Sequence, residues 1–208
     1  MKKLLKVCGM REAANIKELA ALSPDFMGFI FYPPSSRFVS TIDENTIKSI
    51  PKKIRKVGVF VNENVLKIKD IAKNFRLDVI QLHGDESPDV CMKLKSEGYV
   101  VIKAFHIASA DDFSDMLDYE GTCDYFHFDT KTQGYGGSGM TFDWTFLDRY
   151  TGQTPFLLSG GIRLESVQDL WKLNHPKLAG FDINSGFEVK PALKDIDLVK
   201  KFKERMAL

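Results

Sequence analysis

The chain has 208 residues, of which 44% are hydrophobic and 12% aromatic, and its formal net charge is +1. A chain of this length fits one domain and can fold without disulfides or a structural metal. The balanced charge argues against the basic surface that nucleic acid binding requires. The longest apolar run, Phe26–Tyr32, is far too short to cross a bilayer. We therefore expect neither nucleic acid nor a membrane as a partner.

The N-terminus and the cysteines predict a cytoplasmic location. The basic start of the chain loses its apolar character at Lys6, which argues against a signal peptide. Cys8, Cys91 and Cys123 are widely spaced and form neither a C-x-x-C pair nor a zinc-binding spacing. We expect a reduced protein without a metal.

Short apolar runs alternate with amphipathic segments along the chain. The runs are rich in Val, Ile, Phe and Leu, as in parallel strands that are covered on both faces. They predict strands at 4–7, 27–31, 57–61, 79–82, 99–105, 125–128, 156–158 and 178–183. Helices are predicted between them at 12–22, 43–50, 64–75, 88–97, 110–118, 143–149, 164–172 and 195–206.

Local signals support several helix ends. Ser87 before Pro88 predicts a capping hydroxyl ahead of a proline at the first helical position. Ser109 with Asp112 resembles a capping box, and Gly98 is a typical residue just past a helix.

Eight strand–helix units that begin with a strand predict a (β/α)8 TIM barrel, an α/β fold. A doubly wound open sheet is the alternative, but no run has the polar character of an edge strand, which favours closure. No linker-like segment divides the chain, so residues 1–208 are predicted to form one (β/α)8 barrel domain. In such barrels the active site lies at the C-terminal ends of the strands.

Two strand ends carry small residues suited to phosphate. The seventh and eighth strands are followed by Ser159, Gly160 and Gly161, and by Asn184, Ser185 and Gly186. Backbone N–H groups of these neighbouring loops can converge on an anion, although tight turns would also explain either set alone. Their joint position predicts a phosphate site.

Residues 134–139 match the pattern G-x-G-x-x-G. A dinucleotide site is not expected, because no strand directly precedes these glycines and Ser159 stands where an acidic residue would be needed. We expect a loop that closes over a substrate, with a plain connection as the alternative.

Three reactive or charged side chains follow strands. Cys8 can be a thiolate base or nucleophile, although free cysteine is often only a buried apolar residue. Asp129 ends an apolar run, where desolvation would raise its pKa and suit a general acid; a turn or capping role is the alternative. Arg37 can hold a carboxylate with two hydrogen bonds, although its position alone favours an ordinary surface arginine.

Strand alternation predicts contacts inside the barrel. Lys6 shares a strand face with Cys8, and the first and last strands become neighbours on closure, so Lys6 and Asp182 should meet. Each charge would supply the partner that the other needs when buried.

Histidines fall into two groups. His127 shares a strand face with Asp129 and is predicted to be a hydrogen-bonded interior residue, while His83 is expected to line the site beside Gln81. His106 and His175 are expected in surface or loop positions.

The strand ends, read in order, resemble the phosphoribosylanthranilate isomerase family of tryptophan biosynthesis. The matching segments are Lys6–Gly9, Gly28–Arg37, Val57–Asn62, Gln81–Gly84, Phe128–Thr130, Tyr135–Gly139, Thr141–Trp144, Leu158–Gly161 and Asp182–Glu188. Chance does not explain so many matches in register from the first strand to the last.

The resemblance implies a barrel without metal or cofactor. It implies conversion of N-(5-phosphoribosyl)anthranilate to 1-(2-carboxyphenylamino)-1-deoxyribulose 5-phosphate by an Amadori rearrangement. By the match, Cys8 is the general base, Asp129 is the general acid, Arg37 holds the anthranilate carboxylate and the two small-residue loops bind phosphate. These roles call for a raised pKa of Asp129 and a lowered pKa of Cys8, through Lys6 or substrate charge.

Two positions depart from the family pattern. Asn184 stands where the family commonly has serine, and it can still donate a hydrogen bond. The segment before Asp129 contains His127 where aliphatic residues are usual.

Other functions stay open at this stage. One is another phosphosugar isomerase or lyase on the same barrel, but a synthase would need a lysine where Cys8 stands, and an epimerase would need metal-binding histidines. A non-catalytic phosphometabolite-binding barrel would lack the acid or the base. Redox sensing by Cys8 has no nearby resolving cysteine. We expect a monomer, and a second Amadori substrate stays open.

Overall fold

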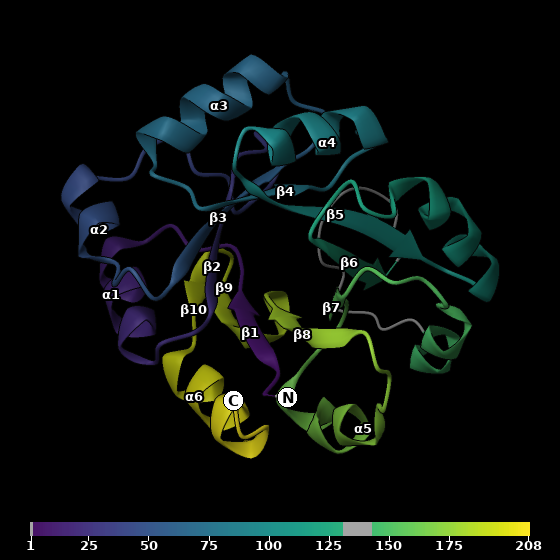
Figure 1. Ribbon diagram of the computed structural model, residues 1–208. Coiled ribbons are helices and arrows are strands. Elements are labelled where there is room, and N and C mark those ends of the chain that lie inside the picture. Colours follow the sequence, from purple (N-terminus) through teal and green to yellow (C-terminus); the bar gives the residue numbers. More distant parts are fainter. Residues whose placement is uncertain (1, 131–142) are drawn as a thin grey trace.

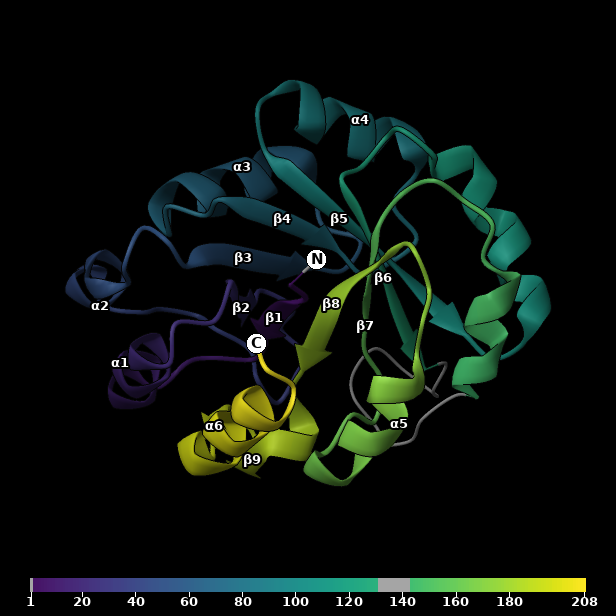
Figure 2. The ribbon, with the colours of Figure 1, turned by 60° about the horizontal axis from the view of Figure 1, so that its bottom comes forward.

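The structure, a computed structural model, describes residues 2–130 and 143–208. Eight parallel strands pair in sequence order, and β8 pairs with β1 to close a barrel. The helices lie outside the strands in both views (Figures 1 and 2). The (β/α)8 fold class is therefore confirmed, and the open sheet is wrong. Within the described ranges, no helix has the length and apolar character needed to cross a membrane.

The barrel strands are β1 Leu4–Val7, β2 Phe26–Ile30, β3 Arg55–Phe60, β4 Val79–Leu82, β5 Val100–Ile107, β6 Tyr125–Thr130, β7 Phe156–Leu158 and β8 Leu178–Ile183. The α-helices are α1 Ala13–Ala21, α2 Glu44–Ser49, α3 Val65–Asn74, α4 Pro88–Ser96, α5 Val167–Lys172 and α6 Ile196–Arg205. The 3₁₀ segments are η1 Ala110–Tyr119, η2 Trp144–Arg149, η3 Leu164–Ser166 and η4 Ser185–Phe187. An antiparallel pair, β9 Glu188–Lys190 and β10 Leu193–Lys194, lies outside the barrel.

All eight predicted strands are present, with small shifts at their ends. The helical segments after β5 and β6 are 3₁₀ rather than α-helical, and η1 is rich in aspartate, a poor helix former. Ser109 and Asp112 form the predicted capping box, and Gly98 ends α4 with φ +93°. The predicted cap by the Ser87 hydroxyl is wrong, because the backbone carbonyl of Ser87, not its hydroxyl, accepts from Val90 N–H at 3.1 Å; Pro88 does stand at the first helical position.

Apolar residues form two clusters. The larger one fills the space between strands and helices, and the smaller one lies on the inward strand faces and comprises Cys8, Phe26, Val57, Val59, Val79, Ile102 and Leu157. The register of β1 against β8 pairs Lys6 with Asp182, whose Nζ and Oδ2 atoms are 2.6 Å apart. The predicted meeting of these two charges inside the barrel is confirmed.

Three aspartates close the N-terminal end of the barrel in the same way. Each stands immediately before an even-numbered strand and accepts a hydrogen bond from the backbone of the preceding strand. The bonds run from Leu5 N to Asp25 Oδ2 at 2.8 Å, from Lys56 N to Asp78 Oδ2 at 2.8 Å and from Val101 N to Asp124 Oδ2 at 2.9 Å. Each aspartate N–H in turn donates to the carbonyl of that same partner residue. Each aspartate is therefore hydrogen-bonded to both the N–H and the C=O of one residue on the preceding strand, which joins the two neighbouring strands.

We expect Asp25→Ala to lower the free energy of unfolding by about 1–2 kcal/mol, because the buried Leu5 N–H loses its acceptor. Urea denaturation measures the change. Asp25→Asn keeps an acceptor oxygen and should lose less. Equal losses in the two variants would show that the carboxylate charge, not the hydrogen bond, matters.

Candidate active site

A cavity at the C-terminal end of the barrel strands brings the predicted site residues together. Its lining includes the predicted Cys8, Arg37, Gln81, His83, Asp129, Gly160, Gly161, Asp182, Asn184, Ser185 and Gly186. Residues Ile30, Tyr32, Ser35, Val59, Val61, His127, Ser159 and Ile162 complete it. Lys6 lies one step deeper on β1 and is fully buried.

Cys8 directly follows β1 and is held there by its neighbours. Its backbone N–H donates to the carbonyl of Ile183 at 3.0 Å, which continues the β1–β8 pairing. A Cβ atom at Gly28 would stand 2.7 Å from the Cys8 sulfur. The glycine on β2 therefore leaves the space that the thiol fills.

Burial raises the pKa of the Cys8 thiol, and the Lys6 and Lys194 ammonium groups only partly offset this effect. The Asp182 carboxylate adds to the rise, and it also holds the Lys6 charge in an ion pair. The prediction of a lowered thiol pKa through Lys6 is therefore wrong for the site without substrate.

A buried network lies beneath the thiol. Asp182 Oδ2 accepts a hydrogen bond from Lys6 Nζ at 2.6 Å and lies 2.8 Å from His127 Nε2. Burial lowers the pKa of His127, so its imidazole is neutral near pH 7 and Nε2–H donates to Asp182. Burial opposes ionisation of Asp182, but Lys6 and His127 together hold its pKa below the usual value. The expected interior position of His127 is confirmed.

Three buried polar atoms of the lining have no hydrogen-bond partner among the described residues: Gln81 Oε1, His127 Nδ1 and Asp182 Oδ1. Each is an acceptor, and a buried acceptor without a donor costs about 1–3 kcal/mol. The cavity is therefore suited to a ligand that carries hydroxyl groups.

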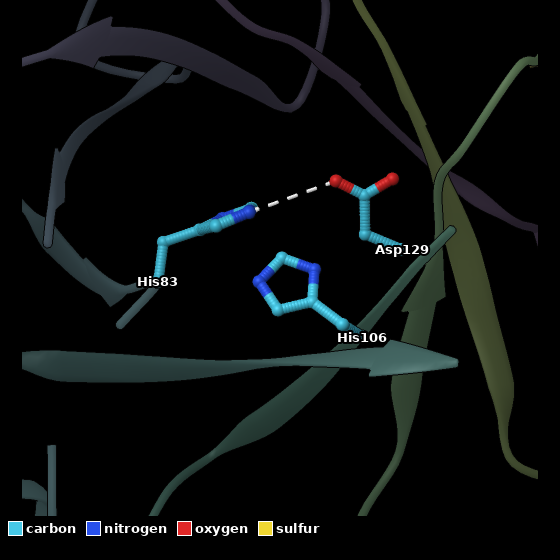
Figure 3. A group of neighbouring side chains, drawn as sticks. All are labelled: His83, His106 and Asp129. Atoms are coloured by element: carbon cyan, nitrogen blue, oxygen red, sulfur yellow. Dashed lines mark ion pairs between the residues drawn. The ribbon is translucent and has the colours of Figure 1, made fainter. Parts of the chain in front are cut away.

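Asp129 stands at the end of β6 beside two histidines (Figure 3). Its Oδ2 lies 3.6 Å from His83 Nε2, and the other ring nitrogen of His83 lies 3.0 Å from Gln81 Nε2. His106 pairs with Asp129 in the β5–β6 register, and its ring centroid is 5.2 Å from that of His83. The expectation that His106 is a surface or loop residue is wrong, because β5 continues past the predicted end. His175 does lie in a loop, where Nε2 contacts the Tyr150 carbonyl.

The pKa of Asp129 does not follow the sequence prediction. Burial raises it, but the contact with His83 and the other neighbouring histidines outweigh burial and lower the pKa to about 2. Burial lowers the pKa of His106 to about 4, and that of His127 also falls. Both rings are then neutral near pH 7, and Asp129 is ionised there.

Arg37 contacts a partner that the sequence did not reveal. Its Nε and Nη2 atoms lie 3.0 and 2.6 Å from the two carboxylate oxygens of Glu188, and Lys194 Nζ lies 2.5 Å from the same carboxylate. The structure gives Nη1 no partner within residues 2–130 and 143–208. Glu188 ends one of the segments that match the family. No sequence pattern pointed to Lys194, because only the short β9–β10 hairpin brings it to the site.

The two small-residue loops lie against each other. Gly160 and Gly161 have φ values of +86° and +65°, which other residues rarely adopt. A Cβ atom at Gly186 would stand 2.3 Å from the Ile162 carbonyl oxygen. Asn184 Oδ1 accepts a hydrogen bond from Lys194 Nζ at 2.7 Å, which leaves its amide N–H groups to donate. The predicted closing loop at 134–139 lies outside the described residues.

Known proteins share both the sequence and the fold. A protein from Parabacteroides distasonis named N-(5'-phosphoribosyl)anthranilate isomerase is 51% identical over 96% of this chain and 91% of its own length. One of the same name from Phocaeicola vulgatus is 50% identical over 96% of this chain and 95% of its own length.

Solved structures agree with these relatives. Phosphoribosyl anthranilate isomerase from Thermotoga maritima superposes with a TM-score of 0.84 at 34% identity, over 99% of this chain and all of that one. Another solved isomerase is in complex with reduced 1-(o-carboxyphenylamino)-1-deoxyribulose 5-phosphate and has a TM-score of 0.80 at 30% identity, over 99% of this chain and all of that one. A third structure, of monomers generated from a dimeric Thermotoga maritima enzyme, has the same TM-score and identity, over 99% of this chain and 98% of that one.

A sequence profile of the N-(5'-phosphoribosyl)anthranilate (PRA) isomerase family matches residues 5–205, nearly the whole barrel. Together with relatives at half identity over almost the full length, this match is decisive. The chain belongs to the N-(5'-phosphoribosyl)anthranilate isomerase family.

Proposed function

We propose that the chain converts N-(5-phosphoribosyl)anthranilate to 1-(2-carboxyphenylamino)-1-deoxyribulose 5-phosphate, an acid–base Amadori rearrangement in tryptophan biosynthesis. One observation carries this proposal: a thiol and a carboxyl group line the same cavity, together with an arginine and two loops of small residues. Family membership agrees with this function.

Each part of the substrate has a complementary group. Backbone N–H groups of the loops at Gly160–Gly161 and Ser185–Gly186 receive the phosphate. Arg37 receives the anthranilate carboxylate through Nη1 and the second N–H of Nη2, because Glu188 occupies Nε and the first. Sugar hydroxyl groups donate to the buried acceptors Gln81 Oε1 and Asp182 Oδ1.

Asp129 acts as the general acid and Cys8 as the general base. Asp129 protonates the ribose ring oxygen, the furanose opens, and a protonated imine forms. The imine acidifies the hydrogen on the adjacent carbon, which the Cys8 thiolate removes to give an enolamine. The enolamine then tautomerises to the ketone. Each step moves a proton, so this reaction needs no redox chemistry.

In the site without substrate, the proton that catalysis needs on Asp129 is on Cys8 instead. Burial keeps Cys8 as a thiol, while Asp129 is a carboxylate. The reactive form, thiolate plus carboxylic acid, has the same number of protons. Substrate binding therefore needs to transfer one proton from sulfur to the carboxyl group, with no net uptake. The substrate's carboxylate and phosphate favour this transfer by raising the pKa of Asp129, and Lys6 and Lys194 stabilise the thiolate.

Two variants test the function and the roles together. We expect Cys8→Ala and Asp129→Asn each to lower kcat at least 100-fold, the scale of general acid–base catalysis. Decay of the substrate's anthranilate fluorescence measures turnover, and thermal melting checks folding. Cys91→Ala, which removes a buried thiol from α4, is the matched control. No turnover by folded wild type would refute the function. Turnover that survives in one variant would refute that residue's role.

The raised pKa of Cys8 predicts slow alkylation at neutral pH. Iodoacetamide reacts with thiolates, so modification of Cys8 should rise about tenfold per pH unit from pH 7 to 9, because the thiol pKa lies above 9.0. Mass spectrometry separates Cys8 from Cys91 and Cys123, whose pKa values burial raises to about 11 and 12. A rate that levels off below pH 8 would contradict the raised pKa.

Glu188 is a positioning residue for Arg37. We expect Glu188→Gln to raise KM about tenfold with little change in kcat, because the guanidinium loses the charged partner that orients it. Steady-state kinetics separates the two constants. Glu12→Gln, which removes a carboxylate paired with Arg11, is the control. A fall in kcat at unchanged KM would assign Glu188 a different role.

We also propose that residues 1–208 form one domain that works as a cytoplasmic monomer without a cofactor. The three cysteines are free and buried, which suits a reducing compartment. Among the described residues, the exposed large apolar side chains lie on five different elements: Leu66, Met92, Leu117, Trp171 and Val189. Light scattering of the purified chain distinguishes the monomer from a dimer.

A further inference from the structure

Three possible metal ligands converge at the ends of three consecutive strands. His83 follows β4, His106 belongs to β5 and Asp129 belongs to β6. One ligand atom from each lies within 4.8 Å of the other two. The two imidazoles and the carboxylate face a common space (Figure 3). His83 and Asp129 also line the cavity, so this space adjoins the substrate site.

The donor set suits a transition metal. Two imidazoles with one carboxylate are a common ligand set of Zn²⁺ sites that keep an open position. Zn²⁺ binds imidazole readily, whereas Mg²⁺ and Ca²⁺ prefer sites made of oxygen ligands only.

Gln81 is placed to support His83 as a metal ligand. Gln81 is 1% exposed, and its Oε1 has no partner among the described residues, while Nε2 contacts His83 Nδ1 at 3.0 Å. In the free site this contact leaves the ring proton of His83 on Nε2, the atom that faces Asp129. Metal binding at Nε2 moves that proton to Nδ1, and a half-turn of the Gln81 amide then lets Oε1 accept from Nδ1–H. Such a hydrogen bond behind a histidine ligand is typical of metal sites.

The distances require a small contraction. Bonds of about 2.0–2.1 Å to a tetrahedral Zn²⁺ separate the ligand atoms by roughly 3.3 Å. His83 Nε2 and Asp129 Oδ2 are already 3.6 Å apart. The His106 ligand atom lies within 4.8 Å of the other two, so the remaining contraction is at most about 1.5 Å.

We propose that His83, His106 and Asp129 bind Zn²⁺ and that the bound ion inhibits the enzyme. A metal on Asp129 removes the carboxylate that has to become the proton donor, so metal and substrate exclude each other. The binding stands on the geometry alone, whereas the inhibition rests on the proposed function.

Calorimetry with ZnCl₂ on the chelator-treated chain tests the binding. We expect one Zn²⁺ per chain, at least tenfold weaker binding in His106→Asn, and less than a twofold change in Cys8→Ala and in the control His175→Asn. If His106→Asn fails to fold, His83→Gln takes its place. Absence of Zn²⁺ binding to wild type, binding unchanged in the ligand variant, or binding lost in Cys8→Ala would each overturn the site.

Kinetics tests the inhibition separately. Zn²⁺ should raise KM and leave kcat unchanged at saturating substrate, and the effect should weaken at least tenfold in His106→Asn relative to that variant's own activity. Inhibition that lowers kcat at unchanged KM would overturn the exclusion of substrate by metal. A folded wild type that binds Zn²⁺ but lacks isomerase activity would refute the proposed function and leave the metal site standing.

Discussion

The ion pair between Lys6 and Asp182 is the interaction on which the barrel and its site both depend. It joins the first strand to the last, and both side chains are almost completely buried. Loss of one partner from such a pair typically costs about 3–5 kcal/mol, because the other charge stays in the interior. A shift of β8 by one residue would turn Asp182 away from Lys6, so the pair also specifies the register of closure. His127 supplies the second hydrogen bond to the buried carboxylate.

The same pair limits the chemistry of the thiol above it. The Asp182 carboxylate opposes the effect of Lys6 on the thiol, so burial still decides the pKa of Cys8. On the other side of the cavity, the neighbouring histidines hold the pKa of Asp129 below its usual value. Under the proposed mechanism, this is the resting protonation state of the site, and substrate charge is needed to reach the reactive one. That mechanism links catalysis to occupancy, because the thiolate forms only where a substrate can use it.

Strand periodicity predicted much of this architecture, and tertiary packing determined the rest. Buried parallel strands have continuous apolar runs, and alternation placed Lys6 beneath Cys8 and opposite Asp182. His106 was misplaced because the predicted strand ended two residues too early, at Phe105. The contact of Lys194 with Glu188 depends on a hairpin too short to produce a periodic pattern. The pKa of Asp129 depends on histidines of neighbouring strands, whose approach no local pattern reports.

The cavity keeps polar atoms that a purely structural interior would not. Gln81 Oε1, His127 Nδ1 and Asp182 Oδ1 are buried acceptors without a donor in the described parts of the chain. Each such atom lowers the free energy of unfolding by about 1–3 kcal/mol, and a whole domain is typically stable by only about 5–15 kcal/mol. Apolar residues of similar size would remove this cost. Unpaired acceptors on residues that line one cavity therefore argue for a hydroxyl-rich ligand, since its donors would recover the lost hydrogen bonds on binding. The hydrogen bonds that these acceptors do not make in the folded chain can therefore be made with the sugar, which trades stability for recognition.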